Sequence, residues 1–366
     1  MGLIDMPPEI QFEIVENVAV KRALKMLSRT ARPLRKVAQE VLFKRLQIDL
    51  QKPLQEASID DLRANAKSIR FLELIEFSSD GEKLSHVTKL LPEMVELKAV
   101  LLYRVNLTKE FIHVFLKTAA NIPLRVALKS NVYPTHLVTV PSTPLCISHL
   151  DFGLVDNDSS LQICRSVVRA SALTLQQLSV AFHRVRLMEE TPIVLPVLHS
   201  LNLHVTDERD AAALITPNKA ITKLELNHWP HLPYPFSSAV LPNLRELTAH
   251  LKVLNQLVPG RPVEVIEVSD VTDNQDWVGN NLGRSTARVE QLRMRHDTLV
   301  PWKAERIGTM LPSLKILSVY VSYDVRGPYV LYLGSFAFRT SLKSSKFSLP
   351  SSASRTYDLT CITMEH

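Results

Sequence analysis

Apolar residues recur as short alternating pairs along most of the chain, and this alternation predicts strands with one buried face. The heptapeptide pattern Leu-Pro-x-Leu-x-x-Leu occurs at 195–201, 241–247 and 311–317, with a weaker copy at 91–97. The starts of these copies lie 104, 46 and 70 residues apart, close to multiples of a unit of about 23 to 26 residues. Similar apolar pairs fill the gaps, so strands are expected at Leu72/Leu74, Leu97/Ala99, Val126/Leu128, Leu150/Phe152, Leu178/Val180, Leu201/Leu203, Leu224/Leu226, Leu247/Ala249, Ile266/Val268, Leu292/Met294 and Leu317/Val319.

The segments between these pairs become helical or irregular. Thr108 and Ser159 stand where a helix would begin, and Pro301 suits a first helical turn. The predicted unit is therefore a strand followed by a helix or an irregular crossover. A doubly wound sheet also alternates strand and helix, but the chain has no glycine fingerprint for it.

The residue between the two members of each apolar pair should point to the opposite face of the sheet. In the second half of the chain these outward positions and their neighbours are rich in charge. We therefore expect a mixed-charge face that binds a client protein; a charged face that only contacts solvent is the alternative. The candidate client-binding residues are Glu225, Glu246, Glu267, Arg293, Arg295 and Tyr320.

The first fifty residues predict three short amphipathic helices. Prolines at 7 and 8 suit a helix start, and Pro33 suits the start of a third helix. So short a segment buries too little apolar surface to fold well alone, so a partner or the rest of the chain must cover its apolar face. The apolar positions expected there are Met6, Pro7, Ile10, Ile14, Val18, Leu24 and Leu27.

The net charge of +6 has an uneven distribution. Residues 21–50 hold nine basic and two acidic side chains, whereas residues 1–20 hold four acidic side chains. Aromatic residues make up only 6% of the chain, and the body shows no basic stripe interleaved with them. A solvated basic helix face is the simplest interpretation, and a nucleic-acid partner is not expected.

The sequence contains no recognisable catalytic or metal-binding pattern. Phosphate-cradling glycine loops, serine-nucleophile elbows and paired-cysteine motifs are missing, and Asp270, Asp273 and Asp276 lack the glycine and glutamate of a calcium loop. We therefore expect a non-enzyme without cofactor or metal. Three widely spaced cysteines, no apolar run of membrane-spanning length and no secretory signal predict a cytoplasmic or nuclear protein without a membrane partner.

Residues 3–48 resemble the F-box family. The resemblance rests on Met6-Pro7-Pro8-Glu9-Ile10, the Leu-Lys-Met-Leu-Ser-Arg-Thr stretch at 24–30, Leu34 to Ala38, and the closing Leu-Phe-Lys-Arg-Leu at 42–46. Met6 replaces the commoner leucine, and the frequent tryptophan of the third helix is absent near Leu34. A plain helical cap is the alternative.

The body resembles the leucine-rich-repeat family in its longer, less regular form. The combined expectation is an α/β repeat fold: a three-helix F-box at 3–48, a linker at 49–68, a horseshoe-shaped solenoid of about 10–12 units at 69–334, and a serine-rich tail or cap at 335–366.

These resemblances imply the substrate receptor of a Skp–cullin–F-box ubiquitin ligase. The first segment would dock on the Skp-type adaptor of the cullin complex, and the body would hold a client for ubiquitination and proteasomal degradation. A repeat scaffold for protein interactions without a ligase role is the alternative.

Overall fold

The structure is a computed structural model. It describes residues 44–51, 56–75, 81–134, 143–182, 192–205, 208–227, 236–269, 281–295 and 311–320, the segments 329–332, 340–344 and 360–364, and the isolated residues 6, 14–15, 23, 26–27, 37–38, 41–42 and 307. The chain divides into two compact units, unit 1 (Met1–Leu198) and unit 2 (His199–His366).

Unit 1 contains six strands that pair in sequence order, every neighbouring pair running parallel. Each parallel strand needs a crossover connection to the next. Side chains alternate along each strand, so one face of the strand is buried in the core and the other points outward. The strands are β1 (Arg45–Asp49), β2 (Phe71–Ile75), β3 (Ala99–Tyr103), β4 (Leu124–Lys129), β5 (Ile147–Val155) and β6 (Gln177–Phe182).

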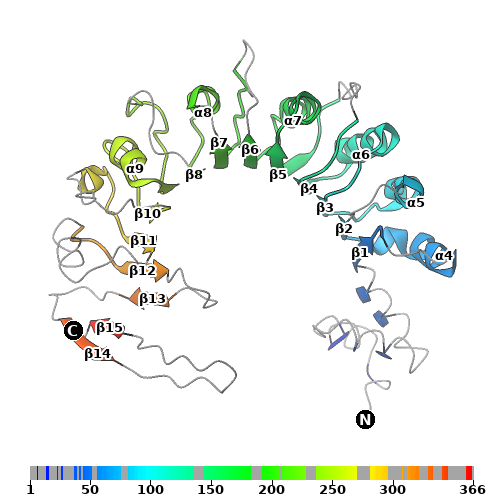
Figure 1. Ribbon diagram of the computed structural model, residues 1–366, viewed down its shortest axis with the longest axis horizontal. Coiled ribbons are helices and arrows are strands. Elements are labelled where there is room, and N and C mark those ends of the chain that lie inside the picture. Colours follow the sequence, from blue (N-terminus) through cyan, green and yellow to red (C-terminus); the bar gives the residue numbers. More distant parts are fainter. Residues whose placement is uncertain are drawn as a thin grey trace. The chain divides into compact units, whose positions relative to one another are not determined.

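Four α-helices occupy crossovers of unit 1 and lie on the same side of its strands (Figure 1). Two of them have clear N-terminal caps: the Thr108 side chain accepts from the Phe111 N–H at 3.2 Å, and Asn157 and Ser160 form a capping box. The helices are α4 (Glu56–Asn65), α5 (Gly81–Leu90), α6 (Lys109–Asn121) and α7 (Asp158–Ala170), with the short 3-10 helices η2 (Ala66–Ser68) and η3 (Leu91–Glu93).

Unit 2 repeats the same plan with shorter elements. Its parallel strands are β7 (Ser200–Val205), β8 (Lys223–Asn227), β9 (Glu246–Ala249), β10 (Val265–Val268), β11 (Gln291–Arg295) and β12 (Ile316–Tyr320). The helices are α8 (Glu208–Ile215), α9 (Leu251–Leu257) and the 3-10 helix η4 (Leu282–Arg284). An antiparallel strand, β13 (Tyr329–Tyr332), pairs with β12, and β14 (Thr340–Ser344) pairs with β15 (Thr360–Met364).

The side chains of the alternating apolar pairs point into the core. Ten of the eleven predicted pairs occupy the expected strands, and every described side chain of these ten is buried. The exception is Leu97/Ala99, because the buried pair of β3 is Val100 and Leu102. The Leu97 N–H donates to the Met94 carbonyl at 3.1 Å, the same three-residue turn that Leu198 makes with Leu195 at 3.2 Å. Leu97 is therefore equivalent to Leu198, and β3 begins after this turn.

The expected fold class, a three-helix F-box followed by a leucine-rich-repeat horseshoe, is wrong. The described residues form an α/β fold with twelve parallel strands, six in each unit, and only six α-helices. Residues 45–48, expected to close a helical domain, belong instead to β1, whose residues pair in parallel with Phe71–Ile75. Helices occupy only some described crossovers, and β13 is antiparallel, so the uniform strand–helix unit is not maintained.

Two ranges expected to be irregular contain regular structure. The supposed linker at 49–68 holds α4 and η2, and the supposed tail at 335–366 holds the β14–β15 pair. Among the described helices, none has the length and apolar character needed to cross a membrane.

Candidate partner-binding surface

The residues between the buried pairs form rows across the sheet of each unit. In unit 2 the central row runs through Asn202, Glu225, Thr248, Glu267, Arg293 and Ser318, each in register with its neighbours. All are half-buried except Ser318, which is 3% exposed. Parallel strands lie about 4.8 Å apart, so this row presents closely spaced polar groups.

The structure brings two of the candidate client-binding residues together. Arg293 Nη1 lies 3.4 Å from Glu267 Oε2, and the two residues are register partners on β11 and β10. With its amide oxygen turned toward the guanidinium, Gln291 accepts from Arg293 Nε at 3.0 Å and Nη2 at 3.3 Å. Arg293 is therefore held from two sides in a fixed orientation.

The other candidates are more dispersed. Glu246 occupies a different row and pairs with Lys223 at 3.0 Å, while Glu225 lies in the central row between Asn202 and Thr248. Arg295 and Tyr320 are backbone register partners on β11 and β12. The expected acidic stretch is thus divided between two rows, and Glu246 and Glu267 each face a cation.

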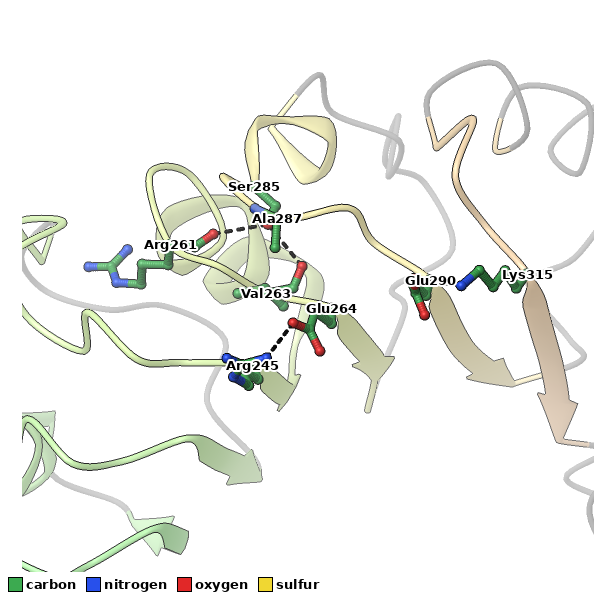
Figure 2. Close-up of polar contacts among 8 residues, drawn as sticks. All are labelled: Arg245, Arg261, Val263, Glu264, Ser285, Ala287, Glu290 and Lys315. Carbon is green, nitrogen blue, oxygen red and sulfur yellow. Dashed lines mark hydrogen bonds and ion pairs between the residues drawn. The ribbon is translucent and has the colours of Figure 1, made fainter.

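A second set of charges lines the N-terminal edge of the strands in unit 2. Arg245, Glu264, Glu290 and Lys315 each precede a strand, and we call them the unit 2 edge ladder (Figure 2). Each residue donates its N–H to the carbonyl of the one before it, at 2.8 Å in all three steps. Ion pairs join Arg245 to Glu264 at 2.6 Å and Lys315 to Glu290 at 2.7 Å. The four charges therefore neutralise one another in two pairs.

Arg261 has a structural role. Its side chain is 1% exposed, burial lowers the pKa of its guanidinium, and all five of its N–H donors bond to backbone carbonyls. The acceptors are Val240 at 2.8 Å, Leu257 at 2.7 Å, Pro259 at 3.4 Å, Phe236 at 3.1 Å and Ser237 at 2.7 Å. In turn, Ser285 Oγ donates to the Arg261 carbonyl at 2.9 Å (Figure 2). Arg261 thus connects α9 to two irregular segments and has no donor left for a ligand.

The corresponding edge of unit 1 has a different charge sequence. Lys44, Arg70 and Lys98 each directly precede a strand, and Arg125 is the second residue of β4; we call these four residues the unit 1 edge ladder. Their backbones are joined in order: Arg70 N donates to Lys44 O at 3.1 Å, Lys98 N to Arg70 O at 2.8 Å, and Arg125 N to Lys98 O at 2.8 Å. The carboxylate of Glu96 approaches this ladder and pairs with Arg70 at 3.0 Å.

A partly exposed apolar surface lies beside this ladder. Phe71 is 40% exposed, and its register partner is Ala99. The Arg45 guanidinium lies 5.2 Å from the centre of the Phe71 ring, and Arg104 lies at the same distance from Tyr103. Our sequence reasoning missed this surface. The signal available was a basic residue recurring at the start of successive strands, 26, 28 and 27 residues apart.

The candidate adaptor-binding residues are only partly described. Ile14 is 40% exposed, Met6 is half-buried, and Leu27 packs on a small cluster of Val15 and Ala38. Met26, next to Leu27, is 62% exposed. The remaining candidates, Pro7, Ile10, Val18 and Leu24, lie outside the described residues.

Burial changes the pKa of some of the described titratable groups. Cys164 is fully buried, and burial raises its pKa to about 12, which suppresses the nucleophilic thiolate. Burial and the nearby Arg125 lower the pKa of His149. Within the described ranges, no three His, Cys, Asp or Glu side chains are grouped to hold a metal ion. Asp270, Asp273 and Asp276 lie outside those ranges.

No protein-family model matches this chain, and no curated protein matches it.

Proposed function

We propose that this protein is a non-catalytic binding protein that holds a client protein on the outward face of its unit 2 strands. The observation that carries this proposal is the Glu267–Arg293 pair within a register-matched row of polar side chains. An arginine already oriented by Glu267 and Gln291 loses little conformational freedom on binding, and arginine is frequent among residues that dominate interface energies.

The sequence resemblance of residues 3–48 supports a more specific role as the substrate-recognition adaptor of a Skp–cullin–F-box ubiquitin ligase. The exposed side chains of Ile14 and Met26 provide apolar contacts for the Skp-type adaptor. The client would then be ubiquitinated because binding raises its effective concentration near the charged enzyme. We expect such a protein to act in the cytoplasm or nucleus.

Co-purification with a recombinant Skp-type adaptor tests the ligase role. The full chain should retain the adaptor, and Ile14→Asp combined with Met26→Asp should lose it, because exposed apolar contacts become charged. The matched control is Val132→Asp combined with Leu173→Asp, two exposed apolar residues of unit 1 outside residues 3–48. An unmodified chain that fails to retain the adaptor would leave the alternative, an interaction scaffold without a ligase role.

Client capture is tested separately by proximity labelling in cells. Glu225→Lys combined with Arg293→Glu preserves net charge but reverses the pattern of the central row, and should abolish the labelling of specific partners. Arg284→Glu combined with Glu110→Lys is the control, since both residues are exposed and lie outside the row. An unchanged partner set in the row variant would contradict the proposal.

A further inference from the structure

We propose that the unit 1 edge ladder and the adjoining Phe71 ring form a binding site for an acidic polypeptide segment that carries an apolar side chain. This site is distinct from the unit 2 face, and the inference does not depend on the ligase role. It rests on charge, geometry and exposure within unit 1.

The first argument is the alignment of like charges. Consecutive backbone hydrogen bonds place Lys44, Arg70, Lys98 and Arg125 on four neighbouring chain segments. Neighbouring strands are separated by about 4.8 Å, so Lys44, Arg70 and Lys98, each directly before its strand, begin within one short row. Arg125 is the register partner of Ala99 and begins in the adjacent row, which also contains Phe71. Long lysine and arginine side chains can then reach successive carboxylates of one bound segment.

The second argument is the shortage of neutralising groups. Glu96 binds Arg70, but within the described part of the chain neither Lys98 nor Arg125 has an ion-pair partner. Lys98 and Arg125 therefore give this edge a positive potential that attracts anionic groups.

The third argument is the apolar contact beside the charges. Phe71 begins β2 directly after Arg70, and 40% of its surface is exposed. Further along the same face lie Leu101 and Tyr103, both half-buried. An apolar side chain of the bound segment could cover Phe71 while its acidic neighbours contact the ladder, which combines apolar burial with charge pairing.

The positions of two guanidinium groups favour a polypeptide over a single-stranded nucleic acid. Nucleic acids of this kind bind by stacking their bases on aromatic faces. Arg45 already lies over Phe71, and Arg104 lies over Tyr103, each 5.2 Å from the ring centre. Carboxylates can instead bind such guanidinium groups through two parallel hydrogen bonds while the arginine stays on its ring.

Fluorescence anisotropy with the full-length protein tests this site. The probe is a fluorescein-labelled twelve-residue peptide of Asp and Glu with one central Phe, and the competitor is a twelve-nucleotide oligo(dT). The unmodified protein should bind the peptide, and Lys98→Glu combined with Arg125→Glu should weaken binding about tenfold or more.

The matched control is Arg245→Glu combined with Lys315→Glu, which makes the same charge change on the unit 2 edge ladder. It should leave peptide affinity within about twofold. Phe71→Ser should weaken the Phe-containing peptide but leave a peptide with Ser in its place unaffected. Circular dichroism confirms that each variant is folded.

Three results would overturn the inference. One is an absence of peptide binding to the unmodified protein, and another is an equal loss in both double variants, which would show only a response to net charge. The third is tighter binding of oligo(dT) than of the peptide, which would assign the ladder to nucleic acid. None of these depends on capture of a client by Arg293.

Discussion

In both edge ladders, backbone hydrogen bonds link the four residues in order, but the charges of the two ladders differ. In unit 2 the charges alternate so that Arg245 pairs with Glu264 and Lys315 with Glu290. In unit 1 all four ladder residues are cationic, and Arg70 pairs with the carboxylate of Glu96. Similar backbone hydrogen bonding can therefore carry charges that neutralise one another, or charges of one sign that attract an anionic partner.

The buried polar groups of the two units also differ. Among described residues, the buried polar side chains of unit 1 are hydroxyls, and its strongly perturbed titratable groups, Cys164 and Tyr133, are held in their neutral forms by burial. Unit 2 instead buries a cation, Arg261, among backbone carbonyls. Unit 2 thus depends on a single charged side chain to hold irregular segments together.

The largest expected effect is the loss of Arg261. Arg261→Ala leaves five carbonyls without their donor, and should lower the free energy of unfolding by about 3 kcal/mol or more. Arg261→Lys, with three donors in place of five, should lose less. All three tryptophans of the chain lie in unit 2, so urea unfolding followed by tryptophan fluorescence measures this change.

Arg284→Ala is the control for that experiment, because Arg284 is an exposed arginine nearby in the sequence. It should change the free energy of unfolding by less than about 0.5 kcal/mol. Equal changes in the free energy of unfolding for Arg261→Ala and Arg284→Ala would show that the hydrogen bonds from Arg261 to backbone carbonyls do not stabilise unit 2.

A smaller effect is expected at the bulge of β5 in unit 1. The register with β6 shifts between Phe152 and Leu154, and a Cβ at Gly153 would lie 3.0 Å from Lys129 Cα and 3.2 Å from the Leu128 carbonyl oxygen. Gly153→Ala should therefore cost about 1 to 3 kcal/mol, measured by thermal unfolding followed by circular dichroism. Ser179→Ala on β6 is the control and should have little effect on the melting temperature. If Gly153→Ala also left it unchanged, the backbone of β4 would have to move to accept the added methyl group, and the prediction would be wrong.

The buried thiol of unit 1 predicts a loss of stability in alkali. Burial raises the Cys164 pKa from 9.0 to about 12, so above pH 9 the unfolded chain releases a proton that the folded chain retains. The stabilisation is complete below pH 9 and falls between pH 9 and 12, with a slope of at most about 1.4 kcal/mol per pH unit. Urea titrations at pH 8.5 and 10.5 should show this loss, and Cys164→Ala should flatten it. A slope that Cys164→Ala leaves unchanged would assign the loss to other groups.

The smallest effect concerns the ladders themselves. A double-mutant cycle on Glu290 and Lys315 should give a coupling of about 0.5 kcal/mol that disappears in 1 M salt, because both side chains are exposed. Lys98→Ala in unit 1 should be neutral or slightly stabilising, since it relieves repulsion from neighbouring cations. A destabilising Lys98→Ala would indicate that the unit 1 edge ladder is neutralised after all.

Much of the strand pattern was predictable because strand burial has a period of two residues. The apolar pairs from Leu201/Leu203 onward were placed in their strands without knowledge of the fold. The prediction of a strand pair at Leu97/Ala99 was wrong because of an extra turn between Met94 and Leu97. This turn places an apolar residue three positions before the buried pair of β3. Strand β1 was missed because Leu46 and Ile48 follow directly on an apparently helical segment.

The unit 1 edge ladder was harder to predict. Charge was assessed over continuous windows, whereas the four cations lie 26 to 28 residues apart and meet only when the strands pair. Arg261 lies between Gly260 and Pro262, a context typical of an exposed turn, so nothing in its neighbourhood indicates burial. Both features depend on long-range register, which local periodicity does not contain.

One side chain in unit 1 connects the turns that follow β3 and β4. Asn131 accepts from the Val105 N–H at 2.8 Å and donates to the Leu102 carbonyl at 3.1 Å, beside Arg104 and Ser130, which both have positive φ. The amide of Asn131 therefore takes the place of a peptide group where the two strands end. In evolutionary terms, such a bridge would let later parts of these loops gain or lose residues while the strands keep their alignment.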